Sequence, residues 1–210
     1  MNTDEQVLVI RRSAFGNLGL FQGVSFKIDH YLQKIWHSDE IEFIARKKAE
    51  TDPDYKQLIP YVIMVHEDTI LCYMRGEKSG EARLKQKYSI GIGGHINLSD
   101  VTALADGFRS TYLNAVAREI QEEVIVDSRH TDFIVGLIND DTNEVGKVHL
   151  GIIHIWFLDS PNIKIRDNEI CNLEFLNIDQ LQKIENRLET WSQFCLKQIS
   201  EIIQTYKPQI

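Results

Sequence analysis

The sequence has few cysteines, and their arrangement would not build a site. Cys72, Cys171 and Cys195 are widely spaced, odd in number and without a C-x-x-C pair. A disulfide framework needs paired cysteines and a structural zinc site needs closely spaced ligands, so the sequence favours neither. Each cysteine stands among apolar residues and is expected to be a small buried core residue. A reducing, cytoplasmic environment fits this usage best.

The chain also lacks long apolar runs and an excess of positive charge. The first six residues carry no basic side chain, and no stretch of about 20 apolar residues occurs, so we expect neither a signal peptide nor a membrane span. With 23 basic against 31 acidic residues the net charge is -8. That field opposes loose binding to nucleic acid or to an anionic membrane. A phosphate ligand stays compatible, because a bound cation can invert the local charge.

The 210 residues, 43% hydrophobic and 26% charged, are typical of a globular protein. A breaker at residues 51–54 leads us to divide the chain into an N-terminal extension, 1–57, packed on a main domain, 58–210. Apolar patterning predicts a strand at 6–10, a helix within 31–49, a hairpin of 61–65 with 69–73, strands at 132–138, 148–158 and 169–176, and a C-terminal helix.

A helix predicted in the middle of the chain carries three carboxylates on one face. Glu119, Glu122 and Glu123 stand at positions i, i+3 and i+4, where like charges destabilise a bare helix. A hard divalent cation with oxygen ligands would offset the repulsion, whereas the alternative is an ordinary solvated acidic face. The opposite face is expected to pack on the core through an apolar stripe of Leu113, Ala117, Ile120 and Val124.

A glycine-rich segment, Gly91-Ile92-Gly93-Gly94-His95, precedes that helix. Together the two segments resemble the signature of the Nudix hydrolase family, G-x5-E-x7-R-E-U-x-E-E-x-G-U, in which U is a bulky aliphatic residue. The residues that match are Gly94, Asp100 in place of the first glutamate, Arg118, Glu119, Ile120, Glu122, Glu123 and Val126. A graded match of this kind is more specific than a single glycine motif.

Three departures mark a divergent branch. Residues 101–117 separate Asp100 from Arg118, which is 17 residues instead of seven, so ten are inserted. Ile125 replaces the glycine that normally ends the helix in a left-handed turn, a conformation that a β-branched residue adopts poorly. Asp100 is one methylene shorter than glutamate, which puts its reach to a metal or to Arg118 in question.

The resemblance implies an α/β fold, a Nudix-type α/β/α sandwich with a mixed sheet, here with an N-terminal extension and a C-terminal helix. It implies a Mg²⁺- or Mn²⁺-dependent hydrolase that cleaves a phosphoanhydride bond in a nucleoside-diphosphate-linked or related phosphorylated metabolite. Glu119, Glu122, Glu123 and the Gly93 carbonyl would hold the metal. The catalytic residues would be Glu122, Glu119 and Arg118, the last orienting a carboxylate by charge-assisted hydrogen bonds.

The source of substrate specificity and the general base are less defined. Arg75 ends the predicted hairpin, and Lys85 and Lys87 belong to a polar segment, 76–87, that is either a surface loop or a basic flap meeting substrate phosphates. Besides Glu122, the candidate general bases are Asp140, Asp141, Glu144 and Glu174. His149 and His154 differ by an odd number in one strand, so we expect structural histidines and no shared metal site.

Two other functions and one other assembly stay open. A non-catalytic ligand-binding or regulatory Nudix domain would bind a nucleotide sugar or similar ligand without metal-dependent turnover. A diphosphate isomerase on the same fold would use a catalytic cysteine. Cys72, on a predicted strand before the signature, is the only cysteine near enough to the signature in the sequence to be a candidate. The C-terminal stripe packs on its own domain or, as the minority interpretation, forms a homodimer seam; its residues are Leu181, Ile184, Leu188, Trp191, Cys195, Ile199 and Ile202.

Overall fold

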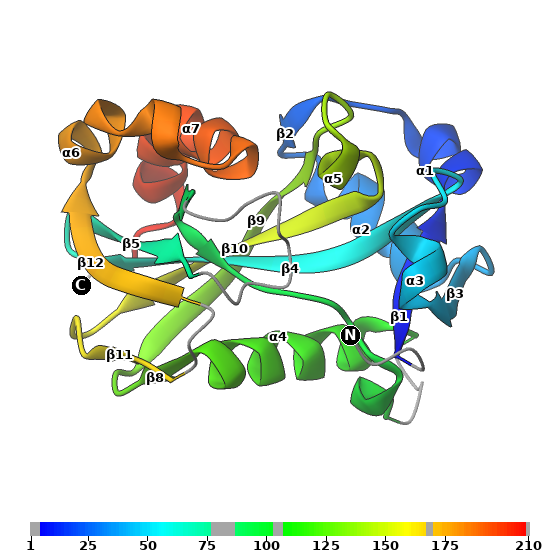
Figure 1. Ribbon diagram of the computed structural model, residues 1–210, viewed down its shortest axis with the longest axis horizontal. Coiled ribbons are helices and arrows are strands. Elements are labelled where there is room, and N and C mark those ends of the chain that lie inside the picture. Colours follow the sequence, from blue (N-terminus) through cyan, green and yellow to red (C-terminus); the bar gives the residue numbers. More distant parts are fainter. Residues whose placement is uncertain (1–4, 77–86, 103–106, 167–169, 209–210) are drawn as a thin grey trace. The chain divides into compact units, whose positions relative to one another are not determined.

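The computed structural model describes residues 5–76, 87–102, 107–166 and 170–208. Helices alternate along the chain with the strands of a large mixed sheet, so the predicted α/β fold class is confirmed (Figure 1). Within the described residues ten strands belong to this sheet, whose main path runs β12-β5-β4-β10-β9-β2. A separate two-stranded sheet joins β11 and β8. No helix of the described residues is both long and apolar enough to cross a membrane.

The chain divides into two compact units, which we call unit 1 (residues 1–61, 93–118 and 136–153) and unit 2 (62–92, 119–135 and 154–210). Four elements have residues in both units: β4 (Tyr55–His66), α4 (Arg109–Glu123), β9 (His130–Asn139) and β10 (His149–Leu158). The division into an extension, 1–57, and a Nudix domain, 58–210, does not coincide with these units and stays a prediction.

Unit 1 is organised around the first strand. Besides its part of the four shared elements, unit 1 contains β1 (Gln6–Arg11), α1 (Arg12–Leu18), β2 (Gly23–Ser25), α2 (Ile28–Trp36), β3 (Ile41–Ala45), α3 (Arg46–Ala49), η2 (Leu98–Asp100) and α5 (Glu144–Lys147). Strand β1 pairs antiparallel with β3 and with β4, and its Leu8 N–H donates to the carbonyl of Ile96 at 2.9 Å. Strand β2 pairs with the end of β9. Figure 1 shows β1, β3, α1 and α3 gathered together.

Unit 2 is organised around the hairpin of β4 and β5. Besides its part of the four shared elements, unit 2 contains β5 (Thr69–Arg75), β6 (Tyr88–Ser89), β7 (Gly91–Ile92), β8 (Val124–Val126), β11 (Ile163–Ile165), β12 (Ile170–Asn177), α6 (Ile178–Lys183), η3 (Glu185–Arg187) and α7 (Thr190–Tyr206). Strand β5 pairs antiparallel with β12, β4 and β6. The β12-to-α6 junction carries a capping box, in which the Asn177 side chain accepts from Gln180 N and the Gln180 side chain accepts from Asn177 N.

Most strands lie where the apolar patterning predicts them, but the helix predicted within 31–49 is confirmed only at its two ends, where α2 and α3 lie, and is wrong for the strand between them. Helix α2 ends at Trp36, and residues 41–45 form β3, whose Ile44 and Ile41 lie opposite Val7 and Ile10 of β1. A β-branched run beside an unpaired strand gains more from cross-strand pairing than from helix formation.

The burial pattern of α4 differs from the predicted stripe. Ile120 and Val124, at the start of β8, are buried as expected, but Leu113 is 39% exposed and Ala117 is exposed. The buried positions of the helix are Thr111, Tyr112, Ala115, Val116, Glu119 and Ile120. The prediction that the charges face away from the packed side is therefore wrong for Glu119, which shares the packed side.

The C-terminal stripe packs inside its own domain, as favoured by the sequence. Its fully buried members are Leu181, Leu188, Cys195, Ile199 and Ile202. It is not one helix, because the chain leaves α6 at Lys183, passes through η3 and begins α7 at Thr190. The homodimer seam stays a prediction.

Candidate active site

An ion pair joins the two signature residues, Asp100 and Arg118, that stand on either side of the inserted segment. Arg118 Nε lies 2.8 Å from Asp100 Oδ1, and its Nη2 lies 2.8 Å from Asp100 Oδ2, so the two groups pair through both carboxylate oxygens. Nη2 also donates to the backbone carbonyl of His95 at 2.8 Å. Bidentate pairing of this kind is geometrically specific and strong for a guanidinium. Arg118 therefore orients a carboxylate, as the resemblance implied, and that carboxylate belongs to Asp100.

The shorter side chain of Asp100 reaches because its backbone is held close to the helix. Asp100 Oδ2 accepts from Asn97 N at 2.7 Å, and the Asp100 carbonyl accepts from Asn114 Nδ2 at 3.0 Å. Asp100 is 5% exposed, and its carboxylate is held by Asn97 N and by the Arg118 guanidinium. The ten-residue insert therefore leaves the Asp100–Arg118 pair of the signature intact.

Gly93 has no room for a side chain. A Cβ built on it would lie 1.7 Å from the carbonyl oxygen of Pro60 in β4. The backbone of the signature glycine segment thus runs directly against the strand. This close approach gives a physical reason for glycine at the position whose carbonyl the sequence analysis assigned to the metal.

Gly93→Ala should destabilise the protein by about 2–3 kcal/mol, because backbone must move to accept the methyl group. The matched control is Gly16→Ala in α1, where a Cβ meets nothing within 4 Å. That control should raise stability by about 0.5–1 kcal/mol through helix propensity. Urea unfolding of the two variants measures both effects, and equal stability of the two would contradict the close approach.

The three signature carboxylates lie at the C-terminal end of α4, and their exposure to solvent differs. Glu119 is 9% exposed, Glu122 is exposed and Glu123 is half-buried. The helix stops at Glu123 and the chain passes straight into β8, where Ile125 lies opposite Lys164 of β11. Arg166 N donates to the Glu123 carbonyl at 2.9 Å. A strand therefore replaces the left-handed glycine turn, which explains how Ile125 is accommodated.

The donor set matches a hard divalent cation in kind, since three carboxylates lie within the last two turns of one helix. In the described part of the chain, however, no three His, Cys, Asp or Glu side chains converge closely enough to form a ready metal site. The glutamates thus fit the cation by their chemistry and not as a preformed cage. This is compatible with Mg²⁺, which keeps several waters and needs few protein ligands.

The predicted substrate-binding residues have different surroundings. Arg75 Nε donates to Glu189 Oε2 at 2.9 Å, so its guanidinium is held by a buried carboxylate. Lys87 is exposed. Lys85 lies outside the described residues. Their role toward substrate phosphates stays a prediction.

The surroundings of His95, the histidine that follows the glycine pair, disfavour its charged form. Burial lowers the pKa of His95 well below its ordinary value, and the charges of Arg46, His149 and Arg118 act in the same direction. Its ring lies 5.7 Å from the ring of His149. His95 is therefore unsuited to carry positive charge toward an anionic substrate.

His149 and His154 are both satisfied structurally, as predicted. His149 Nδ1 lies 2.6 Å from the carbonyl of Val145, and Gln57 Nε2 lies 3.1 Å from its Nε2. In unit 2, His154 Nδ1 lies 2.8 Å from Asp132 Oδ1. Each ring thus has a partner in its own surroundings.

The acidic segment 139–146 is held by a polar network of unit 1. Lys56, fully buried, donates to Asp141 Oδ1 at 2.9 Å and to the Gly146 carbonyl at 3.0 Å, and Arg12 pairs with Asp141 Oδ2 at 2.9 Å. Asp140 is fully buried and accepts from Gln22 Nε2 at 2.8 Å. These contacts give both aspartates structural partners, which makes them poor candidates for a general base.

Asp141→Asn should flatten the acid side of the stability profile. Burial alone would raise the pKa of Asp141, but hydrogen bonds from Lys56 and Arg12 lower it below the ordinary 3.8. As the pH falls, the unfolded chain takes up this proton first, so the stabilisation is present above pH 3.8 and is lost below it. The Tm difference between wild type and variant should therefore shrink below that pH. Asp159→Asn, at an exposed pair with Arg129, should show a small difference at every pH; a pH-independent Asp141 effect would contradict the assignment.

Sequence reasoning missed a buried carboxylate beside Arg75. Glu189 is 6% exposed and accepts from Arg75 Nε and from Ser89 Oγ. It lies in no recognised motif, and the only local signal is an acidic residue directly before the helix Thr190–Tyr206. That signal predicts a helix cap and not a partner for Arg75.

Comparison with known proteins identifies the family. The sequence is 38% identical over 200 residues to Protein YmaB of Bacillus subtilis (strain 168), a match that covers 91% of this chain and 95% of YmaB. No family model matches the sequence. The crystal structure of Tm1382, a candidate Nudix hydrolase, matches with a TM-score of 0.78 and 28% identity, covering 94% of this chain and 100% of Tm1382. The chain belongs to the Nudix family.

DR0079 from Deinococcus radiodurans has the same fold at 14% identity, with a TM-score of 0.52 over 82% of this chain and 96% of that one. The coverage of Tm1382 means that the Nudix likeness includes most of residues 1–57, which the signature alone does not reach. Membership of the Nudix hydrolases supports a hydrolase of pyrophosphate bonds in general.

Proposed function

We propose that this Nudix protein is a divalent-metal-dependent hydrolase that cleaves a phosphoanhydride bond in a nucleoside-diphosphate-linked or related phosphorylated metabolite. The observation that carries the proposal is the combination, on α4, of three carboxylates with an intact Arg118–Asp100 pair. A binding-only relative would have no need to retain both. The negative net charge does not oppose an anionic substrate if a cation neutralises the phosphates.

The roles that we propose are those that the resemblance to the Nudix signature implies. Glu119, Glu122 and Glu123, with the Gly93 carbonyl, would hold Mg²⁺ or Mn²⁺. When bound, the cation would neutralise diphosphate oxygens and make a water molecule easier to deprotonate. Glu122, which is exposed on α4, would orient that water. Arg118 holds the Asp100 carboxylate and the His95 carbonyl beside the helix.

Substrate phosphates would meet basic side chains outside α4. We assign this role to Arg75, Lys85 and Lys87. The carboxylate of Glu189 fixes the direction of the Arg75 guanidinium, and the exposed Lys87 can follow a ligand. A guanidinium and an ammonium suit phosphate oxygens in different ways, the first by directed hydrogen bonds and the second as a point charge.

The isomerase alternative loses support from its cysteine. Cys72 is fully buried, and burial, with the charges of Glu174 and Glu189, raises the pKa of its thiol to about 12. A thiol of that pKa stays protonated near neutral pH and is a weak nucleophile or acid–base group. No observation on the described residues favours Cys72 as a catalytic group.

The test is chromatographic analysis of the phosphorylated products formed from a panel of nucleoside diphosphates, nucleotide sugars and dinucleoside polyphosphates, with Mg²⁺, with Mn²⁺ and with EDTA. The proposal expects cleavage of one substrate class at its phosphoanhydride bond, abolished by EDTA. Thermal stabilisation by a ligand without any cleavage would instead support a binding or regulatory domain.

A further inference from the structure

Side chains of unit 2 hold the backbone of a short segment, residues 89–91, that comes just before the signature glycine Gly93. Strand β6 pairs with β5, and strand β7 pairs with β4. The chain therefore changes its partner strand between β6 and β7, at a bend formed by Ile90. All three residues of the segment are buried, so their backbone groups need partners inside the protein.

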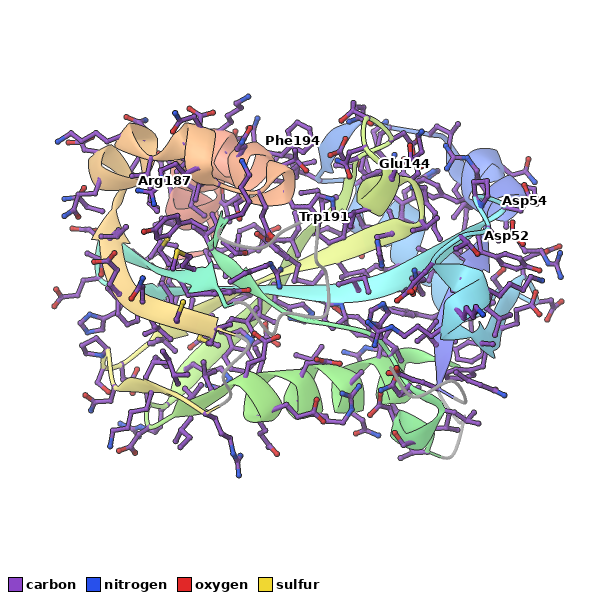
Figure 2. All side chains as sticks on the ribbon, in the orientation of Figure 1. Asp52, Asp54, Glu144, Arg187, Trp191 and Phe194 are labelled. Carbon is purple, nitrogen blue, oxygen red and sulfur yellow. The ribbon has the colours of Figure 1, made fainter. Side chains whose placement is uncertain are left out.

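Two N–H groups of this segment donate to serine hydroxyls. Ile90 N lies 3.1 Å from Ser192 Oγ, and Gly91 N lies 3.3 Å from Ser89 Oγ. Ser192 belongs to the first turn of α7 and follows Trp191, which Figure 2 labels. The direction of these N–H groups is thus set partly from α7 and partly from within the segment.

The carbonyl of Gly91 depends on the hydroxyl of Tyr73 in β5. Tyr73 Oη donates to this carbonyl at 2.9 Å, and Ser89 Oγ lies 3.0 Å from it. A serine hydroxyl has a single proton, and Ser89 Oγ also lies 2.5 Å from Glu189 Oε1. Because the carboxylate is the closer and the charged acceptor, it takes that proton. Tyr73 is therefore the donor on which the Gly91 carbonyl relies.

The surroundings of Tyr73 suit this role. Its side chain is fully buried, and burial raises the pKa of Tyr73 above its ordinary 10.0, so the hydroxyl keeps its proton near neutral pH. The guanidinium carbon of Arg75 lies 5.9 Å from the centroid of the Tyr73 ring. Tyr73 thus interacts both with the segment before Gly93 and with the arginine to which we assign substrate phosphates.

We propose that Tyr73 is a positioning residue for the metal site: its hydrogen bond fixes the peptide plane of Gly91, and with it the direction of the Gly93 carbonyl two residues later. This inference rests on the proposed function, in which the Gly93 carbonyl is a metal ligand. Glycine allows a wide range of φ and ψ, so restraints on the neighbouring backbone decide where the Gly93 carbonyl points.

The test measures Mn²⁺ binding to the full-length protein without substrate, from the electron paramagnetic resonance signal of free Mn²⁺. Tyr73→Phe removes the hydroxyl and keeps the ring, and it should weaken Mn²⁺ binding about fivefold, the effect of one buried hydrogen bond. Tyr31→Phe is the matched control, because Tyr31 is 4% exposed and its Oη donates to the carbonyl of Gly19, a glycine outside the signature, at 2.7 Å. The control should leave Mn²⁺ binding unchanged.

Thermal unfolding separates positioning from a general loosening of the fold. Each variant loses one hydroxyl that is bonded to a glycine carbonyl, so both should lower the Tm by about 2–4 °C. Wild-type Mn²⁺ binding by Tyr73→Phe, or equal weakening in Tyr73→Phe and Tyr31→Phe, would overturn the inference alone. Absence of Mn²⁺ binding by the wild-type protein would overturn the proposed function and the inference with it.

Discussion

Glu122→Gln lowers the rate of metal-dependent hydrolysis at least about 1,000-fold, equivalent to about 4 kcal/mol of transition-state stabilisation, and leaves the fold intact. The loss is expected because an amide cannot supply the charge that the cation and the attacking water require. The fold is expected to persist because Glu122 is exposed on α4. Steady-state kinetics with a substrate from the panel, together with thermal unfolding, measures the two effects separately.

Glu201→Gln is the matched control, since Glu201 is an exposed glutamate on a different helix, α7. It should keep wild-type turnover within about twofold. Turnover by Glu122→Gln at the level of this control would remove Glu122 from the metal assignment. A large loss of Tm in Glu122→Gln would mean that the residue acts through folding.

Arg118→Ala destabilises the protein by about 3 kcal/mol and also reduces turnover. Asp100, 4% exposed at its side chain, would keep its charge but lose both hydrogen bonds from the guanidinium. Removing one partner of a buried pair leaves an uncompensated charge, which costs about 3–5 kcal/mol when burial is complete. Arg118 is 23% exposed, so the lower end of that range applies. Urea unfolding gives the free energy directly.

Arg109→Ala tests whether the loss is specific, because Arg109 is exposed at the start of the same helix. It should change stability by less than about 0.5 kcal/mol. The double change Arg118→Ala/Asp100→Asn should recover part of the lost stability, because the buried charge is removed as well. A double variant no more stable than Arg118→Ala would show that charge burial is not the cause.

Periodicity and turn chemistry were sufficient for the parts of the fold that depend on local sequence. The hairpin of β4 and β5 follows from two apolar runs around Glu67, which adopts a left-handed φ of 53°. Helix α4 and its carboxylates follow from the spacing of Glu119, Glu122 and Glu123. Pairing partners were harder: β3 was predicted as helix, because the strand that stabilises it, β1, lies about 35 residues earlier.

The site shows the same division between local and distant information. The signature predicted Arg118 and a carboxylate partner for it. Whether the shorter Asp100 side chain could reach Arg118 depended on the path of the chain between the two residues, and the spacing of the signature does not define that path. In the structure, hydrogen bonds from Asn97 N and Asn114 Nδ2 hold Asp100 close to the helix. Glu189 was not predicted, because only the folding of α7 onto β6 brings it to Arg75. The inward direction of Glu119 was likewise decided by packing and not by charge.

The most direct measurement is product analysis of one panel substrate incubated with the wild-type protein and Mg²⁺, with EDTA as the parallel reaction. We expect two phosphorylated fragments, or a phosphorylated fragment and free phosphate, formed only with the metal. Tight binding of the substrate with no product in either reaction, or a rearranged diphosphate with no cleavage, would contradict it.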